Sequence, residues 1–461
     1  MKTVDIDFGT ELIPVKLPEA TEVLAMTAPV SVADPFAAVQ DALRNSIASP
    51  GLKEIIRRKL QHNPNARAVV VVSDNTRPVP YRGEAGILWP VIQELLDQGF
   101  TAERILILVA TGTHRALAAA ELRTMLDPRV FELEIPVENH NCLDRENLVY
   151  LGETSRASRV YLNRHYMEAD LKILTGLVES HFMAGVSGGR KSVCPGLIGQ
   201  ASTYVFHGAP MLASPGACNL QLENNPCHEE ALEIARKAGV DYILNVTLDP
   251  YFKLTGVFGG DLEKAHQAAV NHLKSYSGIP VGPEYDIGIT HAGFVGVNHY
   301  QAAKAGVAVI PALKAGGSLV LVANNTDPEP VGSPNYQTVL HLLKLMGPEK
   351  FNKLLLSPDW SFVPDQWQVQ MWAKLFAKIA PDDLIYYSPQ LSRREYQRIP
   401  GRDGNELLPA GQRYRGSLAD AAEVIGNAVQ QRIAHLEARG QKEIRLAFWS
   451  DGPYAVPVKE N

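Results

Sequence analysis

The strongest constraint on the fold is a pair of apolar runs, each followed by a polar loop and then a helical pattern. Residues 68–72 read Ala-Val-Val-Val-Val, and residues 104–110 read Arg-Ile-Leu-Ile-Leu-Val-Ala. Such runs are typical of strands buried on both faces. A helix is expected over about 84–98, with Gly99 at its end. The order strand, helix, strand, helix predicts an α/β fold with mainly parallel sheets.

The chain of 461 residues is long enough for two such domains. We expect an N-terminal domain over residues 1–276 and a C-terminal α/β domain over residues 284–416. Residues 277–283 contain two prolines and two glycines, so they are the expected hinge. A helix and a strand within residues 417–461 are expected to return to the N-terminal domain. Polar residues follow strand ends in both domains, so we expect the active site in the interdomain cleft.

Composition excludes several classes of function. The net charge of −6 provides no basic footprint for nucleic acid. No run approaches the roughly 18 apolar residues of a membrane span. The first residues, Met-Lys-Thr-Val-Asp-Ile-Asp, lack the apolar core of a secretion signal, so we expect a cytoplasmic protein. The four cysteines form no C-x-x-C pair, which argues against a structural zinc site.

Charged and imidazole side chains follow three of the expected strands. Asp74 and Arg77 come after the first, His114 after the second, and Glu179 and His181 after a third expected over 171–175. Ligands of open α/β sheets bind beyond the carboxyl ends of strands. These five residues are therefore predicted to face one crevice.

A glycine-rich stretch between His181 and His207 partly matches the phosphate-binding pattern G-x-x-x-x-G-K-[ST]. Gly185 and Lys191 occupy the expected positions, but Arg190 stands where the second glycine belongs. A nucleotide-binding kinase therefore remains only an alternative.

The residue types suggest how a substrate would be handled. His114 and His181 suit proton transfer on two sides of a substrate, because imidazole titrates near neutral pH. Arg77 and Lys304 can hold a carboxylate, the arginine through two parallel hydrogen bonds.

A cofactor is suggested by two further residues. Lys191, amid backbone amides, suits an anionic cofactor or a covalent link to one. His207 is a third imidazole that can bind a metal such as nickel. These features alone leave open whether the reaction abstracts a proton or transfers a hydride.

The chain resembles the lactate racemase family. The His-x9-Lys-x15-His spacing from His181 through Lys191 to His207 is the most specific part of the resemblance. The other matching pieces lie in the same order along the chain: Ser73–Pro78, Thr111–Arg115, Tyr300–Lys304 and Asp365–Trp367.

The resemblance implies a nickel-pincer nucleotide cofactor, nickel pyridinium-3,5-bisthiocarboxylic acid mononucleotide. Lys191 would be linked to it as a thioamide, and His207 would complete the nickel coordination. The residues expected to seat the cofactor are Asp74, Ser187, Gly188 and Gly189.

The resemblance also implies an isomerase, a racemase or epimerase of a 2-hydroxy acid. Hydride would pass from the substrate to the cofactor and back through a 2-keto acid. His114 and His181 would be the acid/base pair, one on each face. The residues expected to contact the substrate are Arg77, Tyr300, Gln301, Lys304 and Trp367.

Two polar residues beside Tyr300, Asn298 and His299, suggest a substrate larger or more polar than lactate. The expected partners are this small molecule and the enzymes of cofactor biosynthesis. A non-catalytic cofactor-binding protein is a second alternative, but it would not need both His114 and His181.

Overall fold

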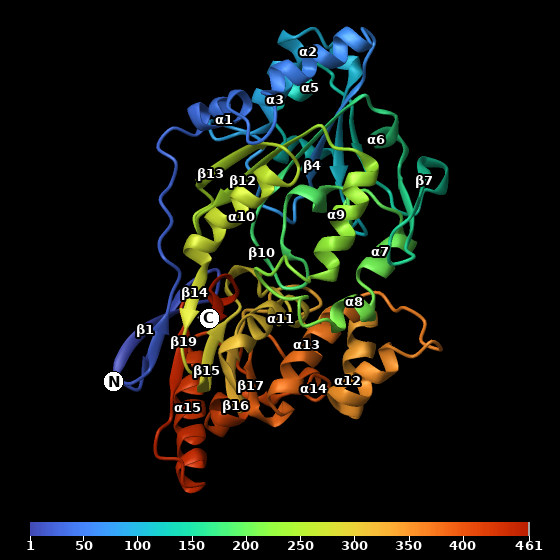
Figure 1. Ribbon diagram of the computed structural model, residues 1–461. Helices are drawn as coiled ribbons and strands as arrows, with labels where there is room; N and C mark the ends of the chain where they lie inside the picture. The colour runs from blue at the N-terminus through green and yellow to red at the C-terminus, as the bar shows by residue number, and fades with distance from the viewer. Residues whose placement is uncertain (460–461) are drawn as a thin grey trace. The chain divides into compact units, whose positions relative to one another are not determined.

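The computed structural model describes residues 1–459 and divides into two compact units, each built around a six-stranded sheet (Figure 1). The N-terminal unit consists of Ala28–His207 and Ser214–Tyr276. The C-terminal unit consists of Met1–Thr27, Gly208–Ala213 and the residues from Ser277 onward. Both sheets are mainly parallel and are flanked by helices, so the predicted α/β class is confirmed.

The sheet of the N-terminal unit has the strand order β13-β12-β9-β4-β5-β6. All neighbours are parallel except β13, which runs antiparallel to β12. Its strands are β4 (Ala68–Ser73), β5 (Ile105–Ala110), β6 (Val137–Asn139), β9 (Leu171–Leu177), β12 (Tyr242–Leu248) and β13 (Leu254–Gly260).

The uniformly apolar sequence of β4 is explained by the burial of both faces of this strand. Val70 and Val72 pack in a core shared with α1 (Pro35–Arg44), α2 (Leu52–His62) and α3 (Leu88–Asp97). Val69 and Val71 point to the opposite face and are also fully buried. The prediction of strands buried on both faces is confirmed for β4.

The sheet of the C-terminal unit is parallel throughout, with the order β18-β17-β16-β15-β19-β3. Its strands are β3 (Glu22–Leu24), β15 (Tyr285–His291), β16 (Leu313–Val322), β17 (Leu384–Tyr387), β18 (Arg402–Asp403) and β19 (Leu446–Trp449). One face packs against α11 (His299–Ala308), α12 (Pro334–Leu355) and α13 (Gln366–Lys378). The other face packs against α15 (Asp420–Ala438) and the hairpin of β1 (Lys2–Asp7) and β2 (Leu12–Leu17).

The expectation that residues 417–461 return to the N-terminal domain is wrong for the residues that the structure describes. Strand β19 pairs with β15, and α15 packs on the sheet of the C-terminal unit. An amphipathic helix followed by an apolar strand can pack on and pair with the open edge of either sheet. The sequence pattern therefore does not identify which sheet the tail joins. Residues 460 and 461 lie outside the described part of the chain.

The N-terminal boundary also differs from the expected one. Residues 1–27 belong to the C-terminal unit, because β3 extends its sheet beside β19. The change between units falls at Tyr276 and Ser277. Residues within the expected hinge form β14 (Gly278–Val281), which pairs with β20 (Val456–Lys459).

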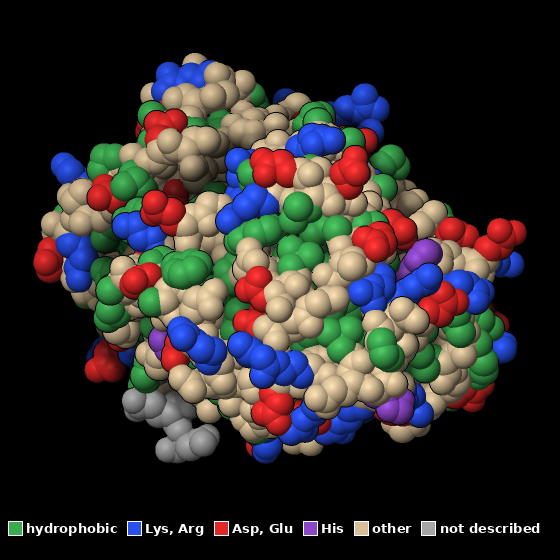
Figure 2. Space-filling model, turned by 90° about the horizontal axis from the view of Figure 1, so that it is seen from above, with side chains coloured by type: hydrophobic (Ala, Val, Ile, Leu, Met, Phe, Trp, Pro, Cys, Tyr) green, Lys and Arg blue, Asp and Glu red, His purple; other side chains and the backbone are tan. Residues whose placement is uncertain are grey.

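The surface in view in Figure 2 carries basic and acidic side chains interspersed with apolar ones. Within residues 1–459, helices do not reach the combination of length and apolarity that crossing a membrane requires.

Candidate active site

The N-terminal unit gathers its candidate residues on the loops that follow β4, β5 and β9. Strand β4 lies between β5 and β9, so the carboxyl ends of the three strands are neighbours. The loop after β4 carries Asp74 and Arg77, and the loop after β5 carries His114. The segment after β9 carries Glu179 and His181.

Asp74 and His114 form a hydrogen bond in which Oδ2 of the carboxylate lies 2.6 Å from Nδ1 of the ring. Asp74 is 4% exposed, whereas 58% of the His114 side chain is exposed. Burial raises the pKa of Asp74, but the hydrogen bonds and charge of His114, with help from Thr76, outweigh it and leave the pKa lowered. The ionised carboxylate accepts the Nδ1 proton, so Nε2 of neutral His114 has a lone pair that can accept another.

Asp74 was expected to seat a cofactor, but both of its oxygens are engaged by protein groups. Oδ1 accepts hydrogen bonds from the hydroxyl of Thr76 at 2.5 Å and from its backbone N–H at 3.2 Å. Oδ2 is taken by His114. The geometry therefore supports an orienting function for Asp74.

His181 has the opposite arrangement of its ring nitrogens. Its Nδ1 lies 3.2 Å from the backbone nitrogens of both Met183 and Ala184, so it accepts from these N–H groups. In the neutral ring the proton then resides on Nε2. His114 thus offers a proton acceptor and His181 a proton donor.

Arg77 pairs through Nη1 with Oε1 of Glu179, at the end of the neighbouring strand β9. Sequence reasoning placed both residues at strand ends but did not identify them as partners. The spacing of 102 residues gave no signal, since only the adjacency of β4 and β9 brings them together.

The glycine-rich turn requires glycine at two positions. Gly188 and Gly189 have φ angles of +75° and +50°. A Cβ at Gly188 would approach Val178 Cγ2 to 2.7 Å, and one at Gly189 would approach the His266 ring to 2.9 Å. Ser187 fastens the same turn, donating its hydroxyl to the carbonyl of Leu177 at 2.8 Å.

The turn leads into η3 (Gly189–Ser192), a 3-10 helix of only four residues. A phosphate-binding loop instead precedes a full α-helix whose N-terminal amides and dipole face the phosphates. This local structure disfavours the nucleotide-binding kinase alternative.

Lys191 is partly buried within η3. Burial lowers the pKa of its amine well below the ordinary value, and the positive charges of Arg77 and Arg190 lower it further. A neutral amine is a nucleophile, as a covalent link to a cofactor requires.

His207 ends α7 (Gln200–Phe206), where its N–H donates to the carbonyl of Thr203 at 2.9 Å. Burial lowers the pKa of His207 to about 3, and the nearby Lys191 and His114 contribute. The imidazole is therefore neutral at physiological pH, which is the form that binds metals.

A protein-only metal centre is not indicated. Among residues 1–459, no group of three or more His, Cys, Asp or Glu side chains could hold a metal ion. A single neutral imidazole fits a metal whose remaining donors come from an organic cofactor. The donor set around His207 is therefore compatible with the pincer cofactor that the family resemblance implies.

The C-terminal unit places Tyr300, Gln301 and Lys304 on α11 and Trp367 at the start of α13. Trp367 donates its indole N–H to the hydroxyl oxygen of Tyr300 at 2.8 Å. Burial raises the pKa of Tyr300, so the phenol keeps its proton and can donate it elsewhere. Gln301 lies one residue further and Lys304 one helical turn further.

Asn298 and His299 do not support the expectation of a larger or more polar substrate. Asn298 caps α11, accepting from the N–H of Gln301 at 2.8 Å. His299 is fully buried, stacks on Trp372 with ring centroids 4.8 Å apart, and bonds to Tyr336 at 2.8 Å. Both side chains thus serve the fold.

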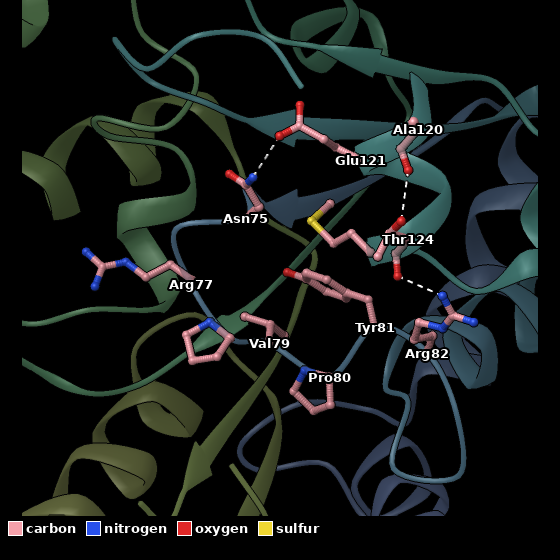
Figure 3. Close-up of a pocket in the computed structure, with 11 residues that line it drawn as sticks. Asn75, Arg77, Val79, Pro80, Tyr81, Arg82, Ala120, Glu121 and Thr124 are labelled. Carbon is pink, nitrogen blue, oxygen red and sulfur yellow. Dashed lines mark hydrogen bonds between the residues drawn. The ribbon is translucent and has the colours of Figure 1, made fainter. Parts of the chain in front are cut away.

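A pocket of about 560 Å³ lies beside the loop after β4 (Figure 3). Two hydrogen bonds join residues that line it: Asn75 donates to Glu121, and Arg82 donates to the carbonyl of Thr124. Arg77 lines the pocket but extends away from the other labelled side chains. The candidate proton carriers are not among the lining residues.

Comparisons with known sequences give consistent results. Residues 8–219 match the family described as the lactate racemase N-terminal domain. A lactate racemase of Lactiplantibacillus plantarum is 34% identical over 340 residues, covering 73% of this chain and 76% of that protein. A lactate racemase of Thermoanaerobacterium thermosaccharolyticum is 31% identical over 340 residues, with the same coverage.

Solved structures agree. The lactate racemase apoprotein of Thermoanaerobacterium thermosaccharolyticum superposes with a TM-score of 0.82 at 25% identity, covering all of both chains. A protein from Thermotoga maritima shares the fold, with a TM-score of 0.58 at 15% identity over 90% of this chain and all of that one.

Proposed function

Because this chain belongs to the lactate racemase family and is an isomerase, we propose that it interconverts the stereoisomers of a 2-hydroxy acid. The observation that carries the proposal is the complementary state of two histidines in one unit. Nε2 of His114 can accept a proton, and Nε2 of His181 carries one. Inverting a carbon that bears a hydroxyl group requires such groups on both of its faces.

We propose that the cofactor is the nickel-pincer nucleotide, attached to the amine of Lys191. His207 would supply the protein ligand to nickel, and the Ser187-Gly188-Gly189 turn would seat the nucleotide. This group would supply a reversible hydride acceptor for the substrate carbon. The lowered pKa values of the Lys191 amine and the His207 imidazole, both caused by burial, support both assignments.

In the proposed reaction His114 removes the hydroxyl proton as the substrate is oxidised to a planar 2-keto acid. Asp74 stabilises the imidazolium that forms, and its hydrogen bond keeps Nε2 directed away from the carboxylate. His181 supplies a proton to the oxygen on the other face. The histidines exchange functions when the opposite stereoisomer reacts.

Substrate binding is assigned to four residues that carry hydrogen-bond donors. Arg77 would bind the carboxylate, with Glu179 holding its guanidinium in place. Tyr300, Gln301 and Lys304 would bind the carboxylate or hydroxyl. Trp367 would orient the phenol of Tyr300 rather than react.

The proposal is tested with nickel-loaded protein made together with the cofactor's biosynthetic enzymes. Single stereoisomers of a panel of 2-hydroxy acids are incubated with it, and the products are separated by chiral chromatography. At least one pair should approach an equal mixture from either side. Loaded protein that converts none of the panel would refute the proposed reaction.

Trp367→Phe should raise KM for the substrate about 2- to 12-fold while changing kcat less. The indole N–H bond to Tyr300 is lost, and one net hydrogen bond contributes about 0.5–1.5 kcal/mol. Steady-state kinetics provide the measurement. Trp360→Phe is the matched control, because it removes an indole bond to Gln366 in the same unit. An equal change in both variants would argue against an orienting function for Trp367.

A further inference from the structure

Arg190 is a charged side chain inside the glycine-rich segment, and it is only 1% exposed. Its Nη2 donates to the carbonyls of Ala184 and Val186, each at 2.9 Å. Its Nη1 lies 3.2 Å from the carbonyl of Gly188 and 3.0 Å from Nε2 of His266. The carbonyls all belong to the turn that immediately precedes Arg190 in the chain.

The environment of this guanidinium is unusual for a buried charge. Among the ion pairs of residues 1–459, none joins Arg190 to a carboxylate. Burial lowers the pKa of Arg190 to about 9. Burying an ion without a counter-ion is costly, so the carbonyl dipoles must provide its compensation. An apolar residue would fill the space without that cost, but it would remove the side-chain donors that join the carbonyls of Ala184, Val186 and Gly188 to one another.

The contacts of Arg190 restrain a backbone segment that would otherwise have access to many conformations. Gly188 and Gly189 adopt positive φ angles, and glycine has more conformational freedom than any other residue. The planar fork of arginine can donate to several carbonyls at once, whereas lysine presents a single ammonium centre. Asn245 adds a further bond, accepting from the N–H of Gly189 at 2.9 Å.

The same contacts determine where the next residue lies. Lys191 directly follows Arg190, and its own N–H donates to the carbonyl of Gly188 at 3.1 Å. We propose that Arg190 is a positioning residue that clamps the turn 184–189 and thereby presents the amine of Lys191 for cofactor attachment. This inference rests on the proposed function, since it assumes that Lys191 carries the cofactor.

Arg190→Lys and Arg190→Met test the clamp, with Arg432→Met as the matched control. Arg432 is also buried, but it lies in the C-terminal unit and pairs with Asp383. Hydrogen exchange of the cofactor-free protein is followed by mass spectrometry over residues 184–191. Both Arg190 variants should exchange about tenfold faster or more in this peptide, because several hydrogen bonds are lost. The control should match wild type there, whatever its effect on the melting temperature.

Intact mass after loading gives the second readout. Arg190→Lys should carry the cofactor adduct on several-fold fewer chains than wild type at equal exposure to it. A turn that exchanges at the wild-type rate in Arg190→Lys would overturn the clamp. So would a loosened turn that still acquires the adduct at the wild-type rate and extent. If Arg190→Met does not fold, the clamp is still tested by comparing the exchange rate of residues 184–191 in Arg190→Lys with that in wild type. A wild-type protein without any adduct would refute the proposed attachment itself.

Discussion

Lys191→Ala protein, made together with the enzymes that synthesise the cofactor, is expected to carry no covalent adduct and to have no racemase activity. The amine of Lys191 is the proposed attachment point, and burial lowers its pKa, which favours the neutral form that acts as a nucleophile. Nickel content should fall with the adduct, because among the described residues no cluster of side chains can hold the metal alone. Intact mass spectrometry and metal analysis of the purified protein provide the measurement.

Two variants make this result specific. Lys191→Arg keeps a long basic side chain but cannot form the thioamide, so it should also lack the adduct. Lys172→Ala removes another partly buried lysine of the same unit, which bonds to the carbonyl of Ala238, and should retain the adduct. An adduct of unchanged mass on Lys191→Ala would place the attachment on a different residue.

His114→Ala should lower kcat by about 10²- to 10⁴-fold, the usual contribution of a positioned general base. The adduct and nickel content should remain at wild-type levels, since His114 is not assigned to attachment. His181→Ala should have a comparable effect. His165→Ala is the control, because this histidine lies at the surface near Glu138. Full activity in either His114→Ala or His181→Ala would refute the pair of proton carriers.

Asp74→Asn tests the orientation of His114 separately from its presence. The amide can donate to Nδ1, which would shift the ring proton to Nε2 and remove the lone pair that accepts the substrate proton. A large loss of kcat with little change in cofactor loading would support the orienting function. Loss of the adduct instead would indicate that Asp74 contacts the cofactor, as the family resemblance implies.

The features that could be predicted from the sequence are those that depend on local residue patterns, namely the buried strands and the loops that follow them. The valine run of β4 and the apolar run of β5 identify parallel strands, because only a strand covered on both faces needs such uniform burial. The loops after these strands then place Asp74, Arg77 and His114 near one another. The positions of the tail and of residues 1–27 were not predictable, since an apolar strand does not specify which sheet it joins.

The site contains contacts that sequence spacing does not encode. Glu179 holds Arg77 across neighbouring strands, and Asp74 binds His114 rather than remaining available to a cofactor. Arg190 looked like a defect in a phosphate-binding pattern, but it is the residue that ties the turn together. His299 looked like a specificity residue because its burial against Trp372 has no local signature.

Racemisation in D2O tests the central claim most directly. If hydride leaves the substrate carbon and returns to it, while His114 and His181 handle only the hydroxyl proton, the C2 hydrogen never exchanges with solvent. The product stereoisomer, analysed by mass spectrometry after chiral separation, should therefore retain protium at C2. Deuterium at C2 in the product at early turnover would show that the carbon is deprotonated and would contradict the hydride mechanism.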